Sequence, residues 1–176
     1  MKIGICGTQT VGKTTLVNAL KGRPEFKDYM FRTERSKELM AQGIPLNTDS
    51  TLKGQTVFLS ERTSELMVEN IITDRTIIDV MAFARASKSM DWNDKEAFEE
   101  YAKRFLKEYD YIFYVSPVGV EMEDNGIRET NIDYRDLIDY TIGRILDSNK
   151  HRIKNLNTIS GSTEKRIEQM LEALSS

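Results

Sequence analysis

The chain has 176 residues, of which 39% are hydrophobic and 30% charged, with only three prolines and ten glycines. This composition is typical of one compact domain with a real hydrophobic core, and it excludes collagen-like, disordered and low-complexity chains. The chain has 25 basic and 28 acidic residues, so its net charge is −3. We therefore do not expect it to coat nucleic acids, and we expect any anionic ligand to be bound by a local cluster of basic residues.

Short apolar stretches alternate with longer segments of helical period, the order expected of an α/β domain whose sheet is mainly parallel. In chain order the pattern predicts a strand over 2–6, a helix over 13–20, a strand over 29–31 and a helix over 34–42. The segment 49–70 opens with Asp-Ser-Thr, which are good capping residues, and carries a long helix; a strand over 71–73 and a helix through 82–84 follow. The pattern then predicts a helix over 91–109 with a capping-box spacing from Asn93 to Glu96, a strand over 111–116, a helix over 132–149, a weak strand over 153–159 and a last helix after 160–162. The sequence therefore predicts a single α/β domain over 1–176, with a mainly parallel sheet of about five strands.

The single cysteine, Cys6, cannot form an internal disulfide or a multi-cysteine metal site. No apolar run approaches the roughly 18 to 20 residues that a membrane span needs. The first residues also reach glycines and a lysine too soon for a signal peptide. We therefore expect a cytoplasmic protein without membrane contact, and the sequence leaves assembly as a homodimer open.

Residues 7–14 read GTQTVGKT, a complete G-x-x-x-x-G-K-[ST] pattern between an expected strand and an expected helix. The glycines let backbone N–H groups point inward at a helix start, the lysine reaches the β- and γ-phosphates, and the last hydroxyl can ligate Mg²⁺. We interpret the segment as a nucleoside-triphosphate site. The residues expected to hold the nucleotide are Gly7, Thr10, Val11, Gly12, Lys13, Thr14 and Thr15.

Guanine-reading residues are missing from the sequence. A GTPase should offer Asn-Lys-x-Asp late in the chain, but Asn149-Lys150 continues as His151-Arg152, and no Asp-x-x-Gly switch is recognisable. Motor, helicase and large ATPase classes normally need a longer chain. A compact small-molecule kinase fits better.

The segment 73–79, TDRTIID, lies at the carboxyl end of the third expected strand, where open parallel sheets face their ligands. Asp74 could there reach the Mg²⁺ shell, and Arg75 the transferred phosphate or the acceptor. A surface ion pair of these two residues would contribute little energy. Beside the phosphate loop we interpret both as catalytic, with Thr14 and Asp74 as the expected metal ligands.

The segment 32–35, RTER, follows the second expected strand. Glu34 is placed where a base accepting the proton of an acceptor hydroxyl would sit. The alternative is an ordinary acid at a helix N-terminus, favoured by the helix dipole. Arg32 and Arg35 flank Glu34 and could instead hold the phosphate of a monophosphate acceptor.

Residues 118–131 form a polar loop after the fourth expected strand, which we interpret as a short lid. Arginines that close over the phosphates would neutralise charge developing in the transition state and expel water. Arg128 is the better candidate for this catalytic and nucleotide-binding role, and Arg135 is a weaker candidate on the substrate side. The alternative is that both are simply solvated.

These motifs occur in order over nearly the whole chain: GTQTVGKTT, the Glu34 segment, TDRTIIDVMAFA, and YDYIFYVSP with the acidic loop after it. Together they resemble the P-loop kinase domain family typified by nicotinamide riboside kinase domains, and more distantly deoxynucleoside and nucleoside monophosphate kinases. The resemblance implies a three-layer α/β P-loop fold, in which helices cover both faces of a central parallel sheet. It implies ATP as phosphate donor and Mg²⁺ as cofactor. It also implies that Glu34 acts on the acceptor side, that Asp74 and Arg75 form the family's Asp-Arg pair, and that 124–128 match its lid.

We therefore expect an ATP-dependent phosphotransferase that transfers the γ-phosphoryl group to a nucleoside or nucleotide. A carboxylate base at Glu34 favours a hydroxyl acceptor, whereas the arginines beside it favour a (deoxy)nucleoside monophosphate kinase. A different class also stays open, a regulatory module that hydrolyses ATP slowly.

Four other residues attract attention in the sequence. Cys6 is expected in the core, Trp92 as a packing anchor between helices, and His151 at the surface. Gly161, after the last expected strand, is a candidate neighbour of the adenine.

Overall fold

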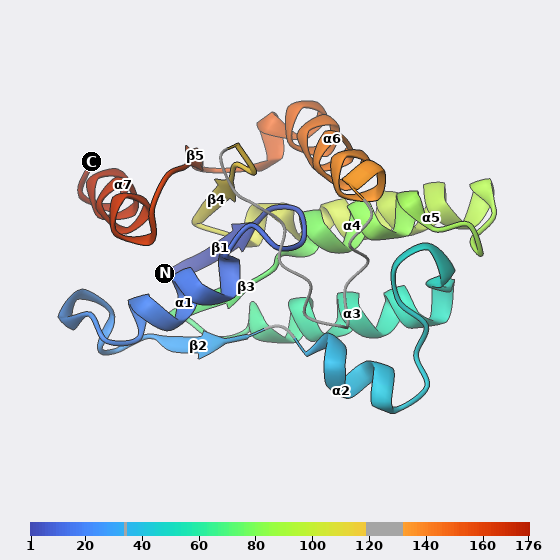
Figure 1. Ribbon diagram of the computed structural model, residues 1–176, viewed down its shortest axis with the longest axis horizontal. Coiled ribbons are helices and arrows are strands. Elements are labelled where there is room, and N and C mark those ends of the chain that lie inside the picture. Colours follow the sequence, from blue (N-terminus) through green and yellow to red (C-terminus); the bar gives the residue numbers. More distant parts are fainter. Residues whose placement is uncertain (34, 119–131) are drawn as a thin grey trace.

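The computed structural model describes residues 1–33, 35–118 and 132–176. Within them, five strands form one parallel sheet in the order β2-β3-β1-β4-β5 (Figure 1). The strands are β1 (Lys2–Cys6), β2 (Met30–Arg32), β3 (Ile71–Asp74), β4 (Tyr111–Val115) and β5 (Leu156–Ile159). The helices are α1 (Lys13–Leu20), α2 (Ser36–Ala41), α3 (Leu52–Glu65), α4 (Ile77–Ala86), α5 (Trp92–Ala102), α6 (Ile132–Ser148) and α7 (Thr163–Ser175).

Helices cover both faces of the sheet, and the alternation of side chains along each strand decides what each face buries. Ile3 and Ile5 of β1 and Phe113 of β4 pack in one cluster with residues of α1 and α7. Cys6 and Ile112 point the other way, into a cluster with residues of α3, α4, α5 and α6. Figure 1 shows these helix groups on opposite sides of the strands. The predicted three-layer α/β fold is thus confirmed.

The parallel register brings two strand ends to one place. β1 lies between β3 and β4, and Ile5 of β1 pairs with Asp74 of β3. The chain leaves β1 just after Cys6 and leaves β3 just after Asp74, so both following turns emerge at the same edge of the sheet. In open parallel sheets this edge is where ligands bind.

Helix boundaries depend on the capping residues. The helix predicted within 49–70 begins at Leu52, directly after the expected capping segment, because the Thr51 side chain accepts from the N–H of Gly54. It ends earlier than expected, at Glu65. The capping box predicted at Asn93 is wrong. Asp91, with extended backbone, caps α5, and Asn93 already lies inside the helix.

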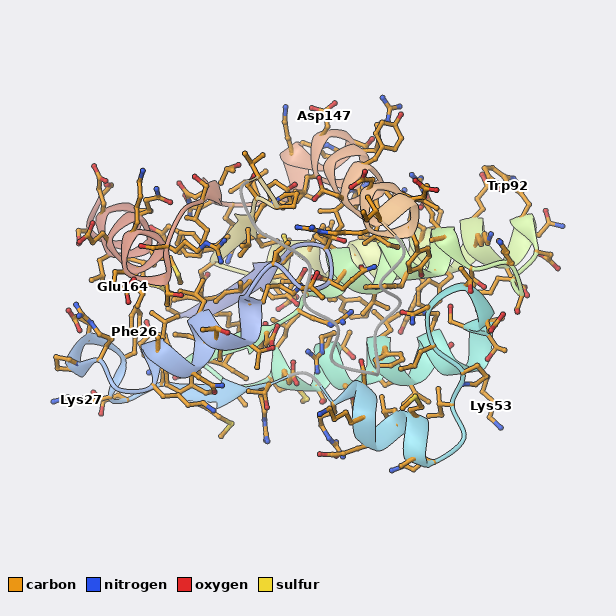
Figure 2. The ribbon with its side chains drawn as sticks, in the orientation of Figure 1. Phe26, Lys27, Lys53, Trp92, Asp147 and Glu164 are labelled. Atoms are coloured by element: carbon orange, nitrogen blue, oxygen red, sulfur yellow. The ribbon has the colours of Figure 1, made fainter. Side chains whose placement is uncertain are left out.

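Three predictions about single residues have clear outcomes. Cys6 is fully buried and His151 is exposed, as predicted. The prediction for Trp92 is wrong. Its side chain lies at the first residue of α5 and is 75% exposed, so it anchors no helix packing (Figure 2). None of the described helices is long and apolar enough to cross a membrane.

Candidate functional site

The loop between β1 and α1 uses backbone conformations that favour glycine. Gly12, at the N-cap of α1, has a φ of 82°, and Gly7 has a φ of 151°. A Cβ on Gly7 would also lie 2.8 Å from the carbonyl oxygen of Val115. The motif's first and last glycines are therefore required by the shape of the loop. Thr10 adopts a positive φ of 59° between them, which tightens the same turn.

Lys13 lies within this loop. Its side chain is 5% exposed, and Nζ donates to the carbonyl oxygens of Gly7 and Thr8, both at 2.6 Å. The ammonium group therefore sits in the loop's concavity, beside the N-terminus of α1, where loops of this type cradle phosphates.

Thr14 and Asp74 come from different elements and meet directly. The Thr14 hydroxyl donates to Asp74 Oδ2 at 2.5 Å, and Asp74 is 1% exposed. The other carboxylate oxygen, Asp74 Oδ1, is buried and has no hydrogen-bond partner among the residues that the structure describes. Mg²⁺ binds through hydroxyl and carboxylate oxygens together with substrate phosphates and waters. The pair therefore fits the Mg²⁺ shell expected for it, although the described residues contain no cluster of three or more acidic, His or Cys ligands.

Asp79 is a residue of this site to which the sequence motifs assigned no role. Its carboxylate accepts from the N–H of Gly7 at 3.2 Å and from the N–H of Thr76 at 2.7 Å, which ties the N-terminus of α4 to the phosphate loop. Burial raises the pKa of Asp79, while the nearby charges of Lys13 and Arg75 oppose that rise. The capping-box spacing from Thr76 to Asp79 was the sequence signal for it.

Arg75 follows Asp74 in a strained turn. Its φ is 80°, in the left-handed region that side chains rarely adopt, and its N–H donates to the carbonyl of Ile5 at 2.9 Å. The guanidinium carbon lies 4.9 Å from the ring centroid of Phe83, a cation–π contact. The turn thus directs Asp74 and Arg75 to different neighbours.

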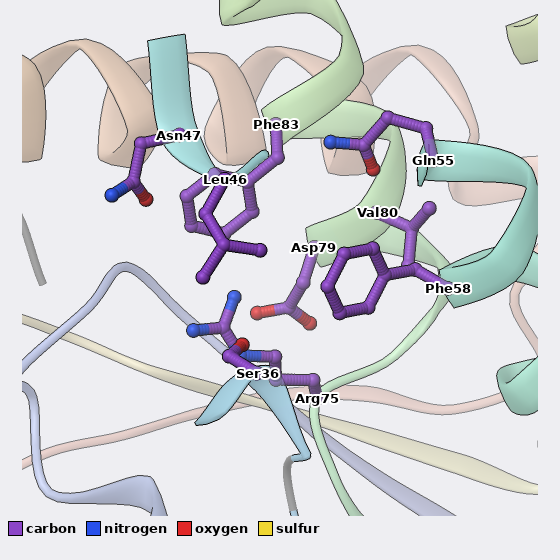
Figure 3. Close-up of a pocket in the computed structure, with 9 residues that line it drawn as sticks. All are labelled: Ser36, Leu46, Asn47, Gln55, Phe58, Arg75, Asp79, Val80 and Phe83. Atoms are coloured by element: carbon purple, nitrogen blue, oxygen red, sulfur yellow. The ribbon is translucent and has the colours of Figure 1, made fainter. Parts of the chain in front are cut away.

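Arg75 lines a small pocket that is open to solvent. The pocket combines apolar and aromatic walls with a few polar groups, as small-molecule sites usually do. Figure 3 shows its residues: Ser36, Leu46, Asn47, Gln55, Phe58, Arg75, Asp79, Val80 and Phe83. Because these residues come from four separate segments of the chain, no local motif in the sequence could have assembled the pocket.

Two further arginines contact the phosphate loop. The carbonyl oxygen of Arg135, on α6, accepts from the Thr8 hydroxyl at 3.0 Å, so this predicted residue lies beside the loop. Arg166, on α7, was not predicted. It is 4% exposed and its Nη1 donates to the Val11 carbonyl at 2.7 Å, which supports the loop from the far end of the chain.

The side chain of Arg35 lines a different groove from that of the pocket. It forms ion pairs with Glu38 at 2.5 Å and with Glu61 at 3.1 Å, and it lines a separate groove with Arg32. Arg35 itself does not line the pocket, although the next residue, Ser36, does. The predicted role of Arg35 in substrate binding stays a prediction.

Two predicted catalytic residues lie outside the described residues. These are Glu34 and Arg128, and the loop interpreted as a lid lies there too, apart from Val118. Thr15 is at the first turn of α1, and Gly161 follows β5 with a φ of 91°. Their contacts with a nucleotide also stay predictions.

Comparison with known proteins places this fold. A family model described as an AAA domain matches residues 2–166. A deoxyadenosine kinase from M. mycoides, solved with dCMP and dCDP, is similar in structure with a TM-score of 0.67 and 19% identity, over 99% of this chain and 98% of the other. The NadR protein in complex with NR has a TM-score of 0.71 and 16% identity, over 99% of this chain and 51% of the other. Shikimate kinase from Aquifex aeolicus has a TM-score of 0.58 and 14% identity, over 99% and 96%.

No curated protein sequence matches the chain. The structural similarity establishes a shared fold, and because the sequence identities are low it establishes the fold alone. The resemblance to P-loop kinase domains is confirmed at that level.

Proposed function

Because this chain belongs to the AAA domain family of P-loop proteins, we propose that it is an ATP-dependent kinase that phosphorylates a nucleoside or nucleotide. One observation carries the proposal. Asp74 contacts Thr14 of the phosphate loop at 2.5 Å, and the next residue, Arg75, lines the aromatic pocket. A phosphate donor in the loop and an acceptor in the pocket would therefore meet at this turn.

The roles of the chain's own residues follow from their chemistry. The loop N–H groups and Lys13 bind the donor's phosphates, and Thr14 with Asp74 would hold Mg²⁺, which neutralises phosphate charge. Arg75 stabilises negative charge on the transferred group from the acceptor side. We assign to Glu34 the removal of the acceptor's hydroxyl proton and to Arg128 further neutralisation of phosphate charge, as their sequence positions predict.

The chemistry of the pocket favours an acceptor with a flat heterocycle. Phe58 and Phe83 offer apolar ring surfaces, and the amides of Asn47 and Gln55 offer both donors and acceptors. A nucleobase or nicotinamide suits such walls better than a small polyhydroxy acid, the type of acceptor named for one of the similar structures. Because two glutamates engage Arg35, which lines a different groove, we favour a nucleoside over its 5′-monophosphate.

The test is acceptor-dependent release of ADP. Nucleosides, ribosylnicotinamide, 5′-monophosphates and shikimate are each offered with ATP and Mg²⁺, and Lys13→Ala serves as the blank. We expect at least one nucleoside or ribosylnicotinamide to raise ADP release well above the blank.

Other outcomes separate the alternatives. Turnover with monophosphates alone would favour the monophosphate kinase and remove the need for a base at Glu34, since a phosphate oxygen is already deprotonated near neutral pH. Slow ADP release that no acceptor accelerates would contradict the kinase and favour the regulatory ATPase.

A further inference from the structure

A buried ionic cluster lies behind the turn between the phosphate loop and the pocket. Arg62, near the end of α3, is 3% exposed, and its Nη2 donates to Glu65 Oε1 at 2.8 Å. Its Nη1 donates to the backbone carbonyl of Asp74 at 2.9 Å. Burying a charge is costly unless its contacts compensate. Neither Arg62 nor Glu65 belongs to the loop or to the pocket lining, so the proposed function leaves this cluster without a role.

The carbonyl that Arg62 holds belongs to the peptide between Asp74 and Arg75. Arg75 has a φ of 80°, a conformation that persists in a non-glycine residue only where surrounding contacts fix it. Two hydrogen bonds fix this one. The N–H of Arg75 donates to Ile5 on β1, and the guanidinium of Arg62 holds the Asp74 carbonyl from α3.

The orientation of this peptide decides where two functional side chains go. Asp74 turns to the Thr14 hydroxyl, and Arg75 turns to the ring of Phe83 in the pocket. Because one strained peptide joins them, its rotation would displace the carboxylate from the phosphate loop and the guanidinium from the pocket together.

Arg62 also shares a helix face with the wall of the pocket. Gln55 and Phe58 line the pocket from α3, and Arg62 follows them by seven and four residues, which places all three on one side of a helix with 3.6 residues per turn. We propose that Arg62 is a positioning residue, which fixes the Asp74–Arg75 peptide and couples the acceptor pocket to the Mg²⁺ and phosphate side. This inference rests on the proposed function, which assigns the acceptor to the pocket and the nucleotide with Mg²⁺ to the phosphate loop.

The test measures how strongly Mg²⁺ improves nucleotide binding, using a fluorescent non-hydrolysable ATP analogue in Mg²⁺ or in EDTA. Arg62→Met removes the contact with Asp74 but leaves Glu65 buried and unpaired. The double variant Arg62→Met/Glu65→Met replaces both charges by apolar groups, an exchange that proteins often tolerate without loss of stability. Arg85→Met, which removes an arginine paired with Glu99 at the surface, is the matched control.

We expect both Arg62 variants to lose roughly tenfold in the Mg²⁺-dependent gain of affinity, as when a group supporting a metal ligand is removed. Binding in EDTA and the behaviour of Arg85→Met should stay as in the wild type. With an accepted acceptor, kcat should fall by about 100-fold, the typical cost of a misplaced catalytic group.

A double variant that folds and keeps the full Mg²⁺-dependent gain would overturn the inference, because Arg62 would then serve stability alone. If neither methionine variant folds, Arg62→Gln replaces them, because its side chain is too short to reach the Asp74 carbonyl. A folded Arg62→Gln that keeps the full Mg²⁺-dependent gain would likewise overturn the inference. The binding readout needs no acceptor. If the wild type binds nucleotide with Mg²⁺ but phosphorylates no acceptor, the proposed function is refuted. The binding measurements then still decide whether Arg62 is a positioning residue.

Discussion

The hydroxyl of Thr14 links helix α1 to the end of strand β3. Thr14 belongs to the first turn of α1, yet its oxygen contacts the carboxylate at the end of β3. Thr14→Val keeps the shape of the side chain and removes the oxygen, whereas Thr14→Ser keeps the oxygen. We expect the valine variant to lose roughly tenfold or more of the Mg²⁺-dependent gain in nucleotide affinity. Titration of the ATP analogue with and without Mg²⁺ measures this, and equal gains in the two variants would contradict the role of Thr14.

Among single residues, the sequence predicted those site residues that belong to one short motif. The residues of the phosphate loop lie within nine positions, so their spacing alone identified them. Asp79 and Arg166 escaped notice because they act on the loop across 72 and 155 positions. Such contacts depend on how the sheet folds, and a single sequence contains no direct record of them.

Between elements, β1 and α4 approach each other so closely that a side chain would not fit. A Cβ on Gly4 would lie 2.5 Å from Thr76 Cγ2 and 2.8 Å from the ring of Tyr109. We expect Gly4→Ala to lower the free energy of unfolding by about 1 to 3 kcal/mol, the usual cost of overpacking a core.

Gly143→Ala is the matched control for this prediction. Gly143 lies in α6, and a Cβ added there would meet no atom of the described part of the chain outside its own helix within 4 Å. Alanine should therefore raise the free energy of unfolding by up to about 1 kcal/mol. Urea denaturation measures both. If Gly4→Ala proved as stable as the wild type, the close packing of β1 against α4 would be wrong.

Glu65, the last residue of α3, makes stability depend on pH. Burial raises its pKa to about 7 from 4.5, and the charge of Arg62 opposes that rise only in part. The folded protein therefore binds the proton more tightly than the unfolded chain. This contribution to stability is complete below about pH 4.5 and is lost as the pH rises to about 7, a decrease of about 2 to 3 kcal/mol.

Glu65→Gln should remove this slope, and Glu164→Gln, at an exposed site on α7, should retain it. Denaturant melts at several pH values between 4.5 and 8 measure the slope. A wild-type stability that rises over this interval, with the glutamine variant unchanged from it, would show that the buried carboxylate is paired well enough to stay ionised.

Elements were predicted well where local signals agree. The strand over 2–6 and the helix over 13–20 match β1 and α1 residue for residue, because a buried apolar run and a glycine-rich loop define their limits. The helix predicted within 49–70 starts directly after Thr51 of the expected capping segment, but its C-terminal end was predicted too late. Residues 66–70, which follow Glu65, contain no glycine or proline that would mark where the helix stops.

Over the whole molecule, the parallel sheet explains why separate motifs form one site. Every strand ends at the same edge, so the loop after β1 and the turn after β3 face one crevice. The order of strands and helices in the sequence predicted the parallel sheet, and the resemblance to P-loop kinase domains predicted the three layers. The acceptor pocket was not predictable, because its walls come from α3, α4 and the segments before them, which meet only once the helices have packed.

The contact of Arg166 with the Val11 carbonyl has a consequence for the order of events during synthesis. The loop that cradles phosphates is made within the first tenth of the chain, yet one of its supports is on α7. A growing chain on the ribosome therefore carries the complete binding motif long before the loop is fully held. Nucleotide should begin to protect the protein from proteolysis only after α7 has left the exit tunnel and docked.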